Sequence, residues 1–582
     1  MATPSGTTAL LRAYLRPHAR GFAALTGALV VGTALPLAGP QLLRSFVDRA
    51  AAGDPTSTLV RIALAYLAVA LAAQAVQIAT TWWGGRLAWR VTNRLREDLT
   101  EHVLGLDLSF HGRHTPGELI ERIDGDVTAL GEFLSRFALH VVGGMLLLAG
   151  TVVLVWREHV LVGASLTAFL AVAGVTVARL QRLTVPAATA DREAVAQLFG
   201  NIEERLGAAE DIRALGAGTH AVNRYHEAVA DVYRAHVRWQ IVSGGMLAAT
   251  NVIFALGTAL LLGLGIYLLS RGTATLGTVL LLFQYSTMVH RPLEQIVGRF
   301  KELQEALAGA VRVRQHLDER PAITDPPGGG TDLPAGGPLA VRFDGVTFAY
   351  PADPAVLHDV TLELTPGRSL GLVGRTGSGK TTIARLLLRL YDPTSGAVVV
   401  GGTDLRAASL GSVRARVRAV TQDVQLFAAD LRDNVTLFSD TVDDDRIEAA
   451  LHEVGLGPWL EALPSGLDTA IGPGGAGLSA GEAQLLAFAR VLLADPGLVI
   501  LDEATSRLDP ATEALVDRAV TRLLRGRTAV VIAHRLASLD RVDEIAVLEH
   551  GHVVEHGSRE ALAADPSSRF AHLLAVTAGR AS

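Results

Sequence analysis

Six long apolar stretches constrain this chain more than any other feature of its sequence. They lie near residues 21–46, 58–85, 134–156, 159–181, 241–270 and 275–296. Each is long enough to form a helix that crosses a lipid bilayer, which takes roughly 20 residues. Hydrophobic residues make up 49% of the chain and charged residues only 19%, a balance typical of membrane proteins. The stretches therefore predict an all-α transmembrane domain of six spans.

The connections between the stretches alternate in length. Residues 156–159 and 270–275 are short links, whereas 86–130 and 180–240 are long, polar and helical in pattern. Arginines are abundant in the long connections and before the first span, and basic residues concentrate on the cytoplasmic side of a membrane. We therefore expect an integral protein of the cell (plasma or inner) membrane, with long cytoplasmic helical extensions and both termini in the cytoplasm.

Neutral polar residues are scattered through the spans, among them Gln77, His140 and Gln284. Such groups line a cavity or form hydrogen bonds between helices. Runs of acidic or basic residues are absent from the middle of the spans, so the pattern favours an amphipathic or apolar cargo over a proton or ion path. The net charge of −6 gives no indication of nucleic-acid binding, and the absence of cysteine excludes disulfides and thiolate metal sites.

Residues 321–338 are rich in proline and glycine and indicate a domain boundary. We expect a transmembrane domain over 1–320, a linker over 321–338 and a soluble α/β domain over 339–582. Within the last of these, an apolar strand leads into a glycine loop and then into a helix, with the spacing G-x-x-x-x-G-K-T. This loop comprises Gly374, Arg375, Thr376, Gly377, Ser378, Gly379, Lys380, Thr381 and Thr382.

That loop has the chemistry of a nucleotide phosphate site in a P-loop NTPase. Glycines let backbone N–H groups surround the phosphates, and the helix N-terminus adds a favourable potential. The lysine reaches the β- and γ-phosphates of ATP, and the threonine hydroxyl reaches Mg²⁺. Lys380 is one of only two lysines among 52 basic residues, so its presence here reflects chemistry rather than composition.

Two further strand ends carry polar residues. An apolar run at 498–501 ends in Asp502 and Glu503, and a second run at 527–533 ends in His534. We expect Asp502 in the Mg²⁺ shell, Glu503 to polarise the water that attacks the γ-phosphate, and His534 to contact that phosphate. A separate stretch, LSAGE, places Ser479, Ala480, Gly481 and Glu482 at the start of a helix, where a phosphate can bind. A carboxylate at Glu482 would repel that phosphate.

With these motifs in this order, the chain resembles the ATP-binding cassette transporters, specifically exporter-type half-transporters that fuse one membrane domain to one nucleotide domain. Tyr350 matches the aromatic residue that stacks on adenine. Gln422 matches the glutamine that senses Mg²⁺, and LSAGE matches the family signature. Residues 110–127 and 213–225 are similar to the two cytoplasmic coupling loops, and residues 506–509 are similar to a dimer-contact loop.

The resemblance implies a dimer of half-transporters with twelve spans, in which each signature closes over the ATP of the other chain. ATP and Mg²⁺ are the implied ligands, and the implied cargo is a small molecule, lipid or peptide. The usual signature is LSGGQ, whereas this chain has Ala480 and Glu482, and Pro473 replaces a residue that is often acidic. These departures slightly favour a heterodimer with one weak ATP site over a homodimer.

Two other functions fit the same resemblance. One is an importer built on the exporter fold, for example for a metal–chelator complex. The other is an ATP-gated regulator that binds nucleotide without productive turnover, and the presence of Glu503 and His534 argues against it. ATP-driven export by alternating access is the leading prediction.

Overall fold

The computed structural model describes all residues except 1–3, 352, 473–476, 503–509, 534–535 and 579–582. The chain divides into two compact units. A helical unit contains Met1–Leu104 and Pro116–Glu319, and a nucleotide unit contains Gly105–Thr115 and Arg320–Ser582. A short segment from the first half of the chain therefore belongs to the nucleotide unit.

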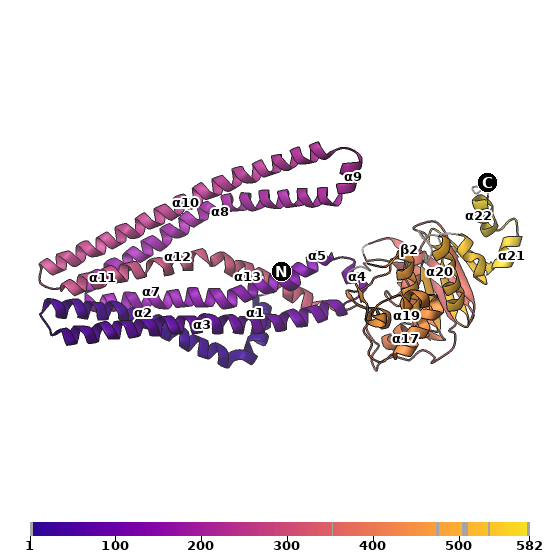
Figure 1. Ribbon diagram of the computed structural model, residues 1–582, viewed down its shortest axis with the longest axis horizontal. Helices are drawn as coiled ribbons and strands as arrows, with labels where there is room; N and C mark the ends of the chain where they lie inside the picture. The colour runs from indigo at the N-terminus through magenta and orange to yellow at the C-terminus, as the bar shows by residue number, and fades with distance from the viewer. Residues whose placement is uncertain (1–3, 352, 473–476, 503–509, 534–535, 579–582) are drawn as a thin grey trace. The chain divides into compact units, whose positions relative to one another are not determined.

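The helical unit is built from long helices joined by short connections (Figure 1). Its elements are α1 (Pro4–Leu15), η1 (Arg16–His18), α2 (Ala19–Ala51), α3 (Thr56–Gly105), α5 (Pro116–Ile120), η2 (Glu121–Asp126), α6 (Val127–Glu132), η3 (Phe133–Val142), α7 (Gly143–Glu158), α8 (Val160–Gly207), α9 (Ala209–Ala214), α10 (Gly218–Ser270), α11 (Leu276–Met288), α12 (His290–Gly298) and α13 (Phe300–Asp318).

All six predicted spans lie almost entirely in helical segments. Within the described residues, five continuous helical stretches are long and apolar enough to cross a membrane. They are Arg12–Ala51, Thr56–Gly105, Pro116–Glu158, Val160–Gly207 and Gly218–Ser270.

The sixth predicted span, residues 275–296, is not one continuous helix. It consists of α11 and α12, which are separated at Val289. Pro292 has no backbone N–H to donate to the carbonyl of Met288, four residues earlier, so the first helix ends there. Proline is tolerated in the first turn of a helix, which is where Pro292 lies in α12. The sequence pattern predicted the apolar segment and missed the break.

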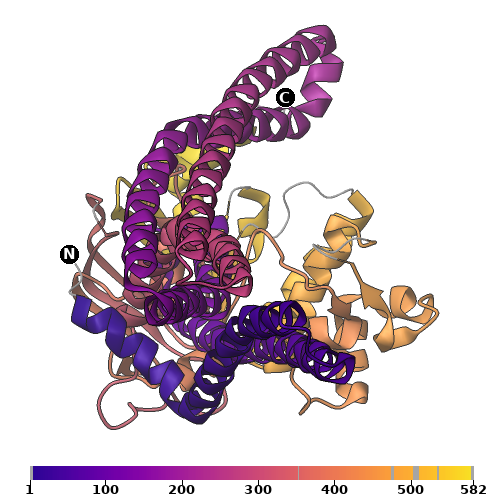
Figure 2. The same ribbon diagram turned by 90° about the vertical axis from the view of Figure 1, so that its left-hand side faces the viewer.

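Helices α8 and α10 run side by side and are joined by α9 (Figures 1 and 2). They contain 48 and 53 residues, which at about 1.5 Å per residue gives lengths of roughly 70–80 Å. A bilayer core is roughly 30 Å thick, so both helices extend far beyond it, as the long polar connections predicted. One stripe of α10 is buried, and it comprises Thr250, Phe254, Gly257, Leu261, Gly265 and Leu268.

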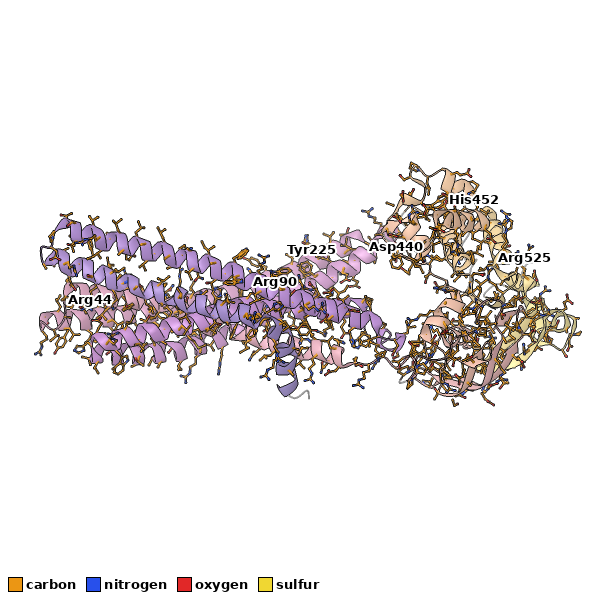
Figure 3. The ribbon with its side chains drawn as sticks, turned by 90° about the horizontal axis from the view of Figure 1, so that it is seen from below. Arg44, Arg90, Tyr225, Asp440, His452 and Arg525 are labelled. Carbon is orange, nitrogen blue, oxygen red and sulfur yellow. The ribbon has the colours of Figure 1, made fainter. Side chains whose placement is uncertain are left out.

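The ends of three helices are joined by polar contacts around Arg44 and Asp48 of α2. Arg44 forms an ion pair with Glu158 of α7. The Asp48 carboxylate accepts hydrogen bonds from the Thr275 hydroxyl and the Gly277 backbone N–H, both at 2.9 Å. Asp48 thereby caps the N-terminus of α11 from another helix. Figure 3 shows Arg44 at one end of the helical unit, with Arg90 and Tyr225 toward the other.

The nucleotide unit is an α/β domain. Its strands are β1 (Val341–Ala349), β2 (Ala355–Leu364), β3 (Ser369–Val373), β4 (Ser395–Val400), β5 (Thr403–Asp404), β6 (Val417–Val420), β7 (Ala429–Asp430), β8 (Ala470–Ile471), β9 (Leu498–Asp502), β10 (Thr528–Ile532), β11 (Glu544–Glu549) and β12 (His552–Ser558). Its helices include α4 (Leu108–His111), α14 (Lys380–Leu387), α15 (Leu410–Arg416), α16 (Leu431–Thr436), α17 (Asp444–Val454), α18 (Gly457–Glu461), α19 (Ala480–Ala494), α20 (Pro510–Leu524), α21 (Arg559–Ala564) and α22 (Arg569–Ala578).

A six-stranded sheet positions the site. Its strand order is β12-β11-β3-β10-β9-β6, and all neighbouring pairs are parallel except the pair at the β12 edge. A second sheet, β2-β1-β4-β5, is antiparallel. Strands β3, β9 and β10 have almost entirely buried side chains because the sheet is covered on both faces. The carboxyl ends of β3, β10, β9 and β6 therefore meet along one edge.

Two segments from outside the sheets complete this unit. Asp107 caps α4 by accepting hydrogen bonds from the backbone N–H groups of Ser109 and Phe110, and it also accepts one from that of Ala322. Within the Pro/Gly-rich segment 321–338, Leu333 is buried and Thr331 forms a bridge to Ala408. Much of this segment is therefore fixed to the nucleotide unit rather than free of it.

Candidate nucleotide site

The glycine loop between β3 and α14 has the backbone that a phosphate cradle needs. Gly377 and Gly379 have φ values of +84° and +105°, which glycine adopts at little cost. A Cβ atom on Gly379 would lie 2.5 Å from Cδ2 of Leu357, and one on Gly374 would lie 2.4 Å from the carbonyl oxygen of Leu548. Glycine is therefore required at these two positions for both conformation and space.

Two side chains of the loop fit a phosphate ligand. The Lys380 ammonium is almost fully buried and donates hydrogen bonds to the carbonyl oxygens of Gly374 (2.7 Å) and Arg375 (3.1 Å). The Ser378 Oγ atom is buried and has no hydrogen-bond partner among the described residues. Buried polar atoms are nearly always paired, so this unpaired hydroxyl is consistent with a ligand in the loop.

A cavity of about 650 Å³ opens beside the loop. It is lined by residues 373–378, by Ala533 after β10, by residues 547–550 at the end of β11, and by Leu573 of α22. Its lining includes none of the four signature residues, 479–482. The structure therefore places the loop and the end of β10 around one cavity and leaves the signature out of it.

Tyr350 follows β1 and lies beside the first turn of α14. Its hydroxyl is 3.1 Å from the Thr382 hydroxyl and accepts a hydrogen bond from Arg385 at 3.0 Å. Its ring packs edge-on against Phe348 and Tyr391, and burial raises the pKa of the Tyr391 phenol. The predicted adenine-stacking residue is thus next to the predicted phosphate loop, although 32 residues separate Tyr350 from Thr382.

The sheet register brings the predicted Mg²⁺ ligands to the same edge. Asp502 is the last residue of β9 and pairs with Ile532 of β10. Gln422 lies two residues beyond the end of β6, whose Val420 pairs with Leu501. Thr381 is exposed in the first turn of α14. Hydroxyl, amide and carboxylate oxygens are ligands that suit Mg²⁺, so this donor set fits the ion.

Several predicted residues lie outside the described part of the chain. They are Glu503 and His534, the dimer-contact segment 506–509, and Pro473. Glu503 directly follows Asp502, the last residue of β9, and His534 directly follows Ala533, which lines the cavity.

The signature residues have a local arrangement that the sequence reasoning missed. The Ser479 hydroxyl accepts a hydrogen bond from the Glu482 N–H at 3.2 Å, and the Glu482 carboxylate accepts one from the Ser479 N–H at 2.7 Å. This reciprocal pair is a capping box at the start of α19. The S-x-x-E spacing carries this signal in the sequence. Ala480 is helical, so its replacement of glycine causes no backbone strain.

Arg385 and Arg490 are two further residues that the sequence reasoning did not single out. Arg385 contacts Tyr350, as described above. Arg490 of α19 donates a hydrogen bond to the carbonyl oxygen of Gln425, three residues after Gln422. No local motif marks either arginine, because each acts on residues more than 30 positions away.

Comparisons with known proteins identify the family of each of the two domains. Residues 22–293 match the model of the ABC transporter transmembrane region, and residues 357–506 match the ABC transporter model. A fatty acid ABC transporter ATP-binding/permease protein of Mycobacterium tuberculosis is 32% identical over 86% of this chain and 79% of its own. A multidrug efflux ATP-binding/permease protein of Mycobacterium bovis is 30% identical over 94% of this chain and 46% of its own.

A solved structure extends the likeness to the whole chain. It is a bacterial Atm1-family ABC exporter with ATP bound, and the match has a TM-score of 0.79 at 26% identity, covering 97% of this chain and 98% of the other. Fold and site together define an ATP-hydrolysing transporter of the membrane. More specifically, the chain belongs to the ABC transporter family and has the exporter-type half-transporter organisation, one membrane domain fused to one ATP-binding domain.

Proposed function

We propose that this transporter exports a small amphipathic molecule, which includes lipids and short peptides of that character, by alternating access. The observation that carries the proposal is a pair of cavities in the helical unit that share Pro36 of α2. One is mainly apolar and the other is polar without fixed charge, so together they match a molecule with both kinds of surface.

The first cavity has a volume of about 260 Å³ and lies among α2, α3 and α11. Its lining is mostly aliphatic, with Tyr66 and Gln284 as the polar side chains. An alkyl chain or a small apolar ring is the ligand part that such a lining accepts.

The second cavity has a volume of about 270 Å³ and lies along α2 toward the other end of the helix. Its polar side chains are Thr33, Gln77, Thr80, Thr81, His140 and Gln295, and no Asp, Glu, Lys or Arg lines it. The hydroxyls of Thr33, Thr80 and Thr81 donate to backbone carbonyls of their own helices, which leaves them as acceptors toward the cavity. A charged group buried there would have no counter-charge in the lining, which is costly. The matching head group is uncharged and forms hydrogen bonds.

ATP hydrolysis in lipid nanodiscs tests this cargo chemistry with three probes of equal alkyl length, each below its micellar concentration. Octyl glucoside is uncharged, octyl sulfate is anionic and octyltrimethylammonium is cationic. We expect only the uncharged probe to stimulate hydrolysis. Direction is tested separately: ATP-dependent uptake of a cargo into inside-out vesicles identifies export. Equal stimulation by all three probes, or stimulation by a charged one alone, contradicts the proposal.

Two substitutions connect that result to the cavity. Thr33→Val and Gln77→Leu remove hydrogen-bonding groups from the lining and should weaken stimulation about five- to tenfold each, because a lost hydrogen bond is worth roughly 1 kcal/mol. Thr26→Val and Gln74→Leu are matched controls on the same two helices, since neither residue lines either cavity. Equal losses in variants and controls would contradict a role for the cavity.

At the nucleotide site, we propose the roles expected from the sequence. Gly374–Thr382 hold the phosphates of ATP, Tyr350 stacks on adenine, and Thr381, Gln422 and Asp502 hold Mg²⁺, which compensates phosphate charge when bound. Glu503 and His534 act on the attacking water and the γ-phosphate. Ser479, Ala480, Gly481 and Glu482 contact the ATP of the partner chain, which is supported by their absence from the cavity beside the phosphate loop of their own chain.

The half-transporter organisation requires a second half-transporter. The sequence slightly favoured a different partner chain because of Glu482 and Pro473. The capping box gives Glu482 a stabilising role that any copy of this chain would share, so the preference for a heterodimer depends on Pro473 and on the repulsion between the Glu482 carboxylate and a bound phosphate. Purification of the chain alone tests the choice between homodimer and heterodimer. Full transport activity would establish the homodimer, and activity only after addition of a second half-transporter would establish the heterodimer.

We also propose residues 1–320 as the membrane domain, 321–338 as its connection and 339–582 as the ATP-binding domain, with both termini in the cytoplasm. The chain has no cysteine, so single cysteines at Ala52 and at Ser567 report sidedness directly. A membrane-impermeant maleimide added to intact cells should label the first and leave the second unlabelled. The reverse pattern contradicts the orientation.

A further inference from the structure

The guanidinium of Arg490 joins the signature helix to the loop that carries Gln422. Arg490 lies near the end of α19, eight residues after Glu482. Its Nε donates to the carbonyl oxygen of Asn434 at 2.7 Å, and its Nη1 donates to that of Gln425 at 2.9 Å. A third, longer contact of 3.4 Å runs from Nη2 to Oδ1 of Asn434. One side chain thus holds two separate backbone segments.

Asn434 extends the same connection. It is fully buried in α16, and its Nδ2 donates to the carbonyl oxygens of Phe427 and Asp430, both at 3.0 Å. Its Oδ1 accepts a hydrogen bond from the Phe427 N–H at 2.8 Å. Residues 425–430 are therefore fixed at several points by two side chains, Arg490 and Asn434. We call residues 421–430 the glutamine loop.

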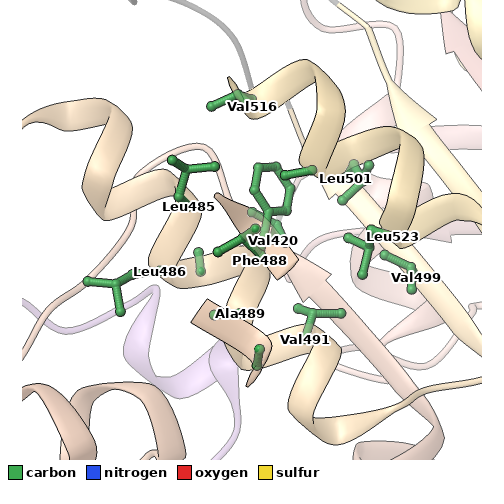
Figure 4. Packing of buried hydrophobic residues seen from close by; sticks show 14 of the residues in the cluster. Val420, Leu485, Leu486, Phe488, Ala489, Val491, Val499, Leu501, Val516 and Leu523 are labelled. Carbon is green, nitrogen blue, oxygen red and sulfur yellow. The ribbon is translucent and has the colours of Figure 1, made fainter. Parts of the chain in front are cut away.

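The glutamine loop begins at the edge of the sheet that holds the candidate site. Gln422 lies three residues before Gln425 and two after the end of β6. Helix α19 packs on this same region, where Phe488 lies beside Val420 of β6 and Leu501 of β9 (Figure 4). The loop is therefore attached at its start to the sheet and further along to α19.

Helix α19 has the properties of a rigid connecting element. Its 15 residues span roughly 22 Å, its N-terminus is fixed by the capping box, and its inner face is buried. Ser479 lies at one end and Arg490 near the other. A displacement of the N-terminus therefore moves the guanidinium with it, because a helix this well packed does not compress.

The chemistry of the connection requires arginine. Its planar fork donates in several fixed directions at once, whereas a lysine ammonium is a compact point charge. The three acceptors of its hydrogen bonds, two backbone carbonyls and one side-chain amide, are all neutral oxygens. Burial lowers the pKa of Arg490 from its ordinary value, which is the expected effect of a charge held away from water without a carboxylate.

We propose that Arg490 is a positioning residue through which the signature of one ATP site sets the position of Gln422 in the other. The proposal rests on the proposed dimer, in which Ser479 contacts the ATP of the partner chain. When that contact forms, α19 carries the glutamine loop with it, and Gln422 reaches its working position. Each site thereby responds to occupancy of the other.

Arg490→Lys tests the proposal in the full-length transporter in nanodiscs, and Arg446→Lys is the matched control. Arg446 is exposed on α17 and donates one long hydrogen bond of 3.5 Å to the Leu493 carbonyl at the end of the same α19. We expect Arg490→Lys to lower kcat for ATP hydrolysis about tenfold, within the usual range of coupling between sites. The affinity for a fluorescent ATP analogue should change less than twofold, because the phosphate loop is untouched.

Two further readouts separate positioning from a purely structural role. The Hill coefficient for ATP should fall from above 1 in the wild type to 1 in Arg490→Lys and stay unchanged in Arg446→Lys. Amide hydrogen exchange of residues 421–430 should be faster in Arg490→Lys, with residues 374–382 unchanged. A wild-type Hill coefficient of 1, or an Arg490→Lys variant with wild-type kcat and cooperativity, overturns the proposal.

A second variant covers the case in which Arg490→Lys does not fold. Arg490→Gln retains a planar amide donor and should fold with the same loss of cooperativity. If it folds and remains cooperative, the proposal is wrong. Failure of this proposal can be distinguished from failure of the proposed function. If the wild-type chain does not dimerise or hydrolyse ATP, the proposed function is wrong, and this result is obtained before any Arg490 variant is compared.

Discussion

Ser479 and Glu482 hold each other at the start of α19, through hydrogen bonds of 3.2 Å and 2.7 Å in opposite directions. The sequence suggests that Glu482 is a repulsive charge in a phosphate site, because glutamine is usual at that position of the signature. The structure gives the carboxylate a partner within its own helix turn. Stability and phosphate repulsion are therefore two separate effects of one residue, and they can be separated by substitution.

Glu482→Gln and Glu482→Ala separate these effects. Glutamine retains an oxygen acceptor for the Ser479 N–H, so we expect thermal stability near that of the wild type. Alanine removes the acceptor and should lower the free energy of unfolding by about 0.5–1 kcal/mol. Loss of the charge should lower KM for ATP about fivefold in both variants, which corresponds to roughly 1 kcal/mol of repulsion through water. A melting temperature for Glu482→Gln as low as that of Glu482→Ala would contradict the capping role.

Glu503→Gln should abolish turnover while ATP still binds. A neutral amide cannot act as a base toward the attacking water, so kcat should fall at least about 100-fold. The ATP-bound dimer should then accumulate, which retention of radiolabelled ATP after gel filtration measures. Glu461→Gln, on the exposed face of α18, is the matched control. Near wild-type hydrolysis by Glu503→Gln would remove Glu503 from the mechanism.

Gly257 and Gly263 of α10 should respond differently to the same substitution. A Cβ atom on Gly257 would lie 2.2 Å from the ring of Phe169 in α8, whereas nothing lies within 4 Å of one on Gly263. Gly257→Ala should therefore lower the melting temperature by forcing α8 and α10 apart. Gly263→Ala should leave it unchanged or raise it, since alanine favours a helix over glycine by about 1 kcal/mol. Equal effects would show that these helices do not pack closely at Gly257.

Asp543 should make the nucleotide unit sensitive to acid. Its partial burial raises the pKa of the carboxyl. Hydrogen bonds from the Ser369 N–H, the Ser369 hydroxyl and Arg368 lower the pKa by more than burial raises it, so the pKa lies below the ordinary 3.8. A carboxyl with a depressed folded-state pKa stabilises the fold above its unfolded pKa, and this contribution is lost as the pH falls through the folded pKa.

We therefore expect the wild-type melting temperature to fall below about pH 4, in part because Asp543 becomes protonated. Asp543→Asn should melt lower than the wild type at pH 7 and show a shallower decline between pH 5 and pH 3. Asp440→Asn is a suitable control, because Asp440 is exposed and its replacement leaves the hydrogen bonds of Asp543 in place. A decline in Asp543→Asn as steep as in the wild type would contradict the assignment.

The sequence by itself determined the features whose physics is local. Six apolar stretches predicted helices long enough to cross a membrane, because an uncharged segment of that length is stable in lipid, and five helical stretches of that length and character are found in the described residues. The glycine spacing of 374–382 predicted a tight turn between a strand and a helix, because glycine readily adopts the backbone conformations found at Gly377 and Gly379. The S-x-x-E capping box was equally local, and its spacing was present in the sequence although the prediction did not use it.

Tertiary structure decided the features that depend on residues far apart in the chain. Parallel strand register brought Asp502 and Gln422 to one edge of the sheet. Packing assigned residues 105–115 to the nucleotide unit, and folding placed Arg490 against a loop 65 residues earlier. Such contacts follow from the geometry of closely packed elements, in which the partner of a side chain is set by the fold rather than by neighbouring residues. The sequence around a polar residue such as Arg490 therefore does not predict its hydrogen-bond partners, which only the folded chain defines.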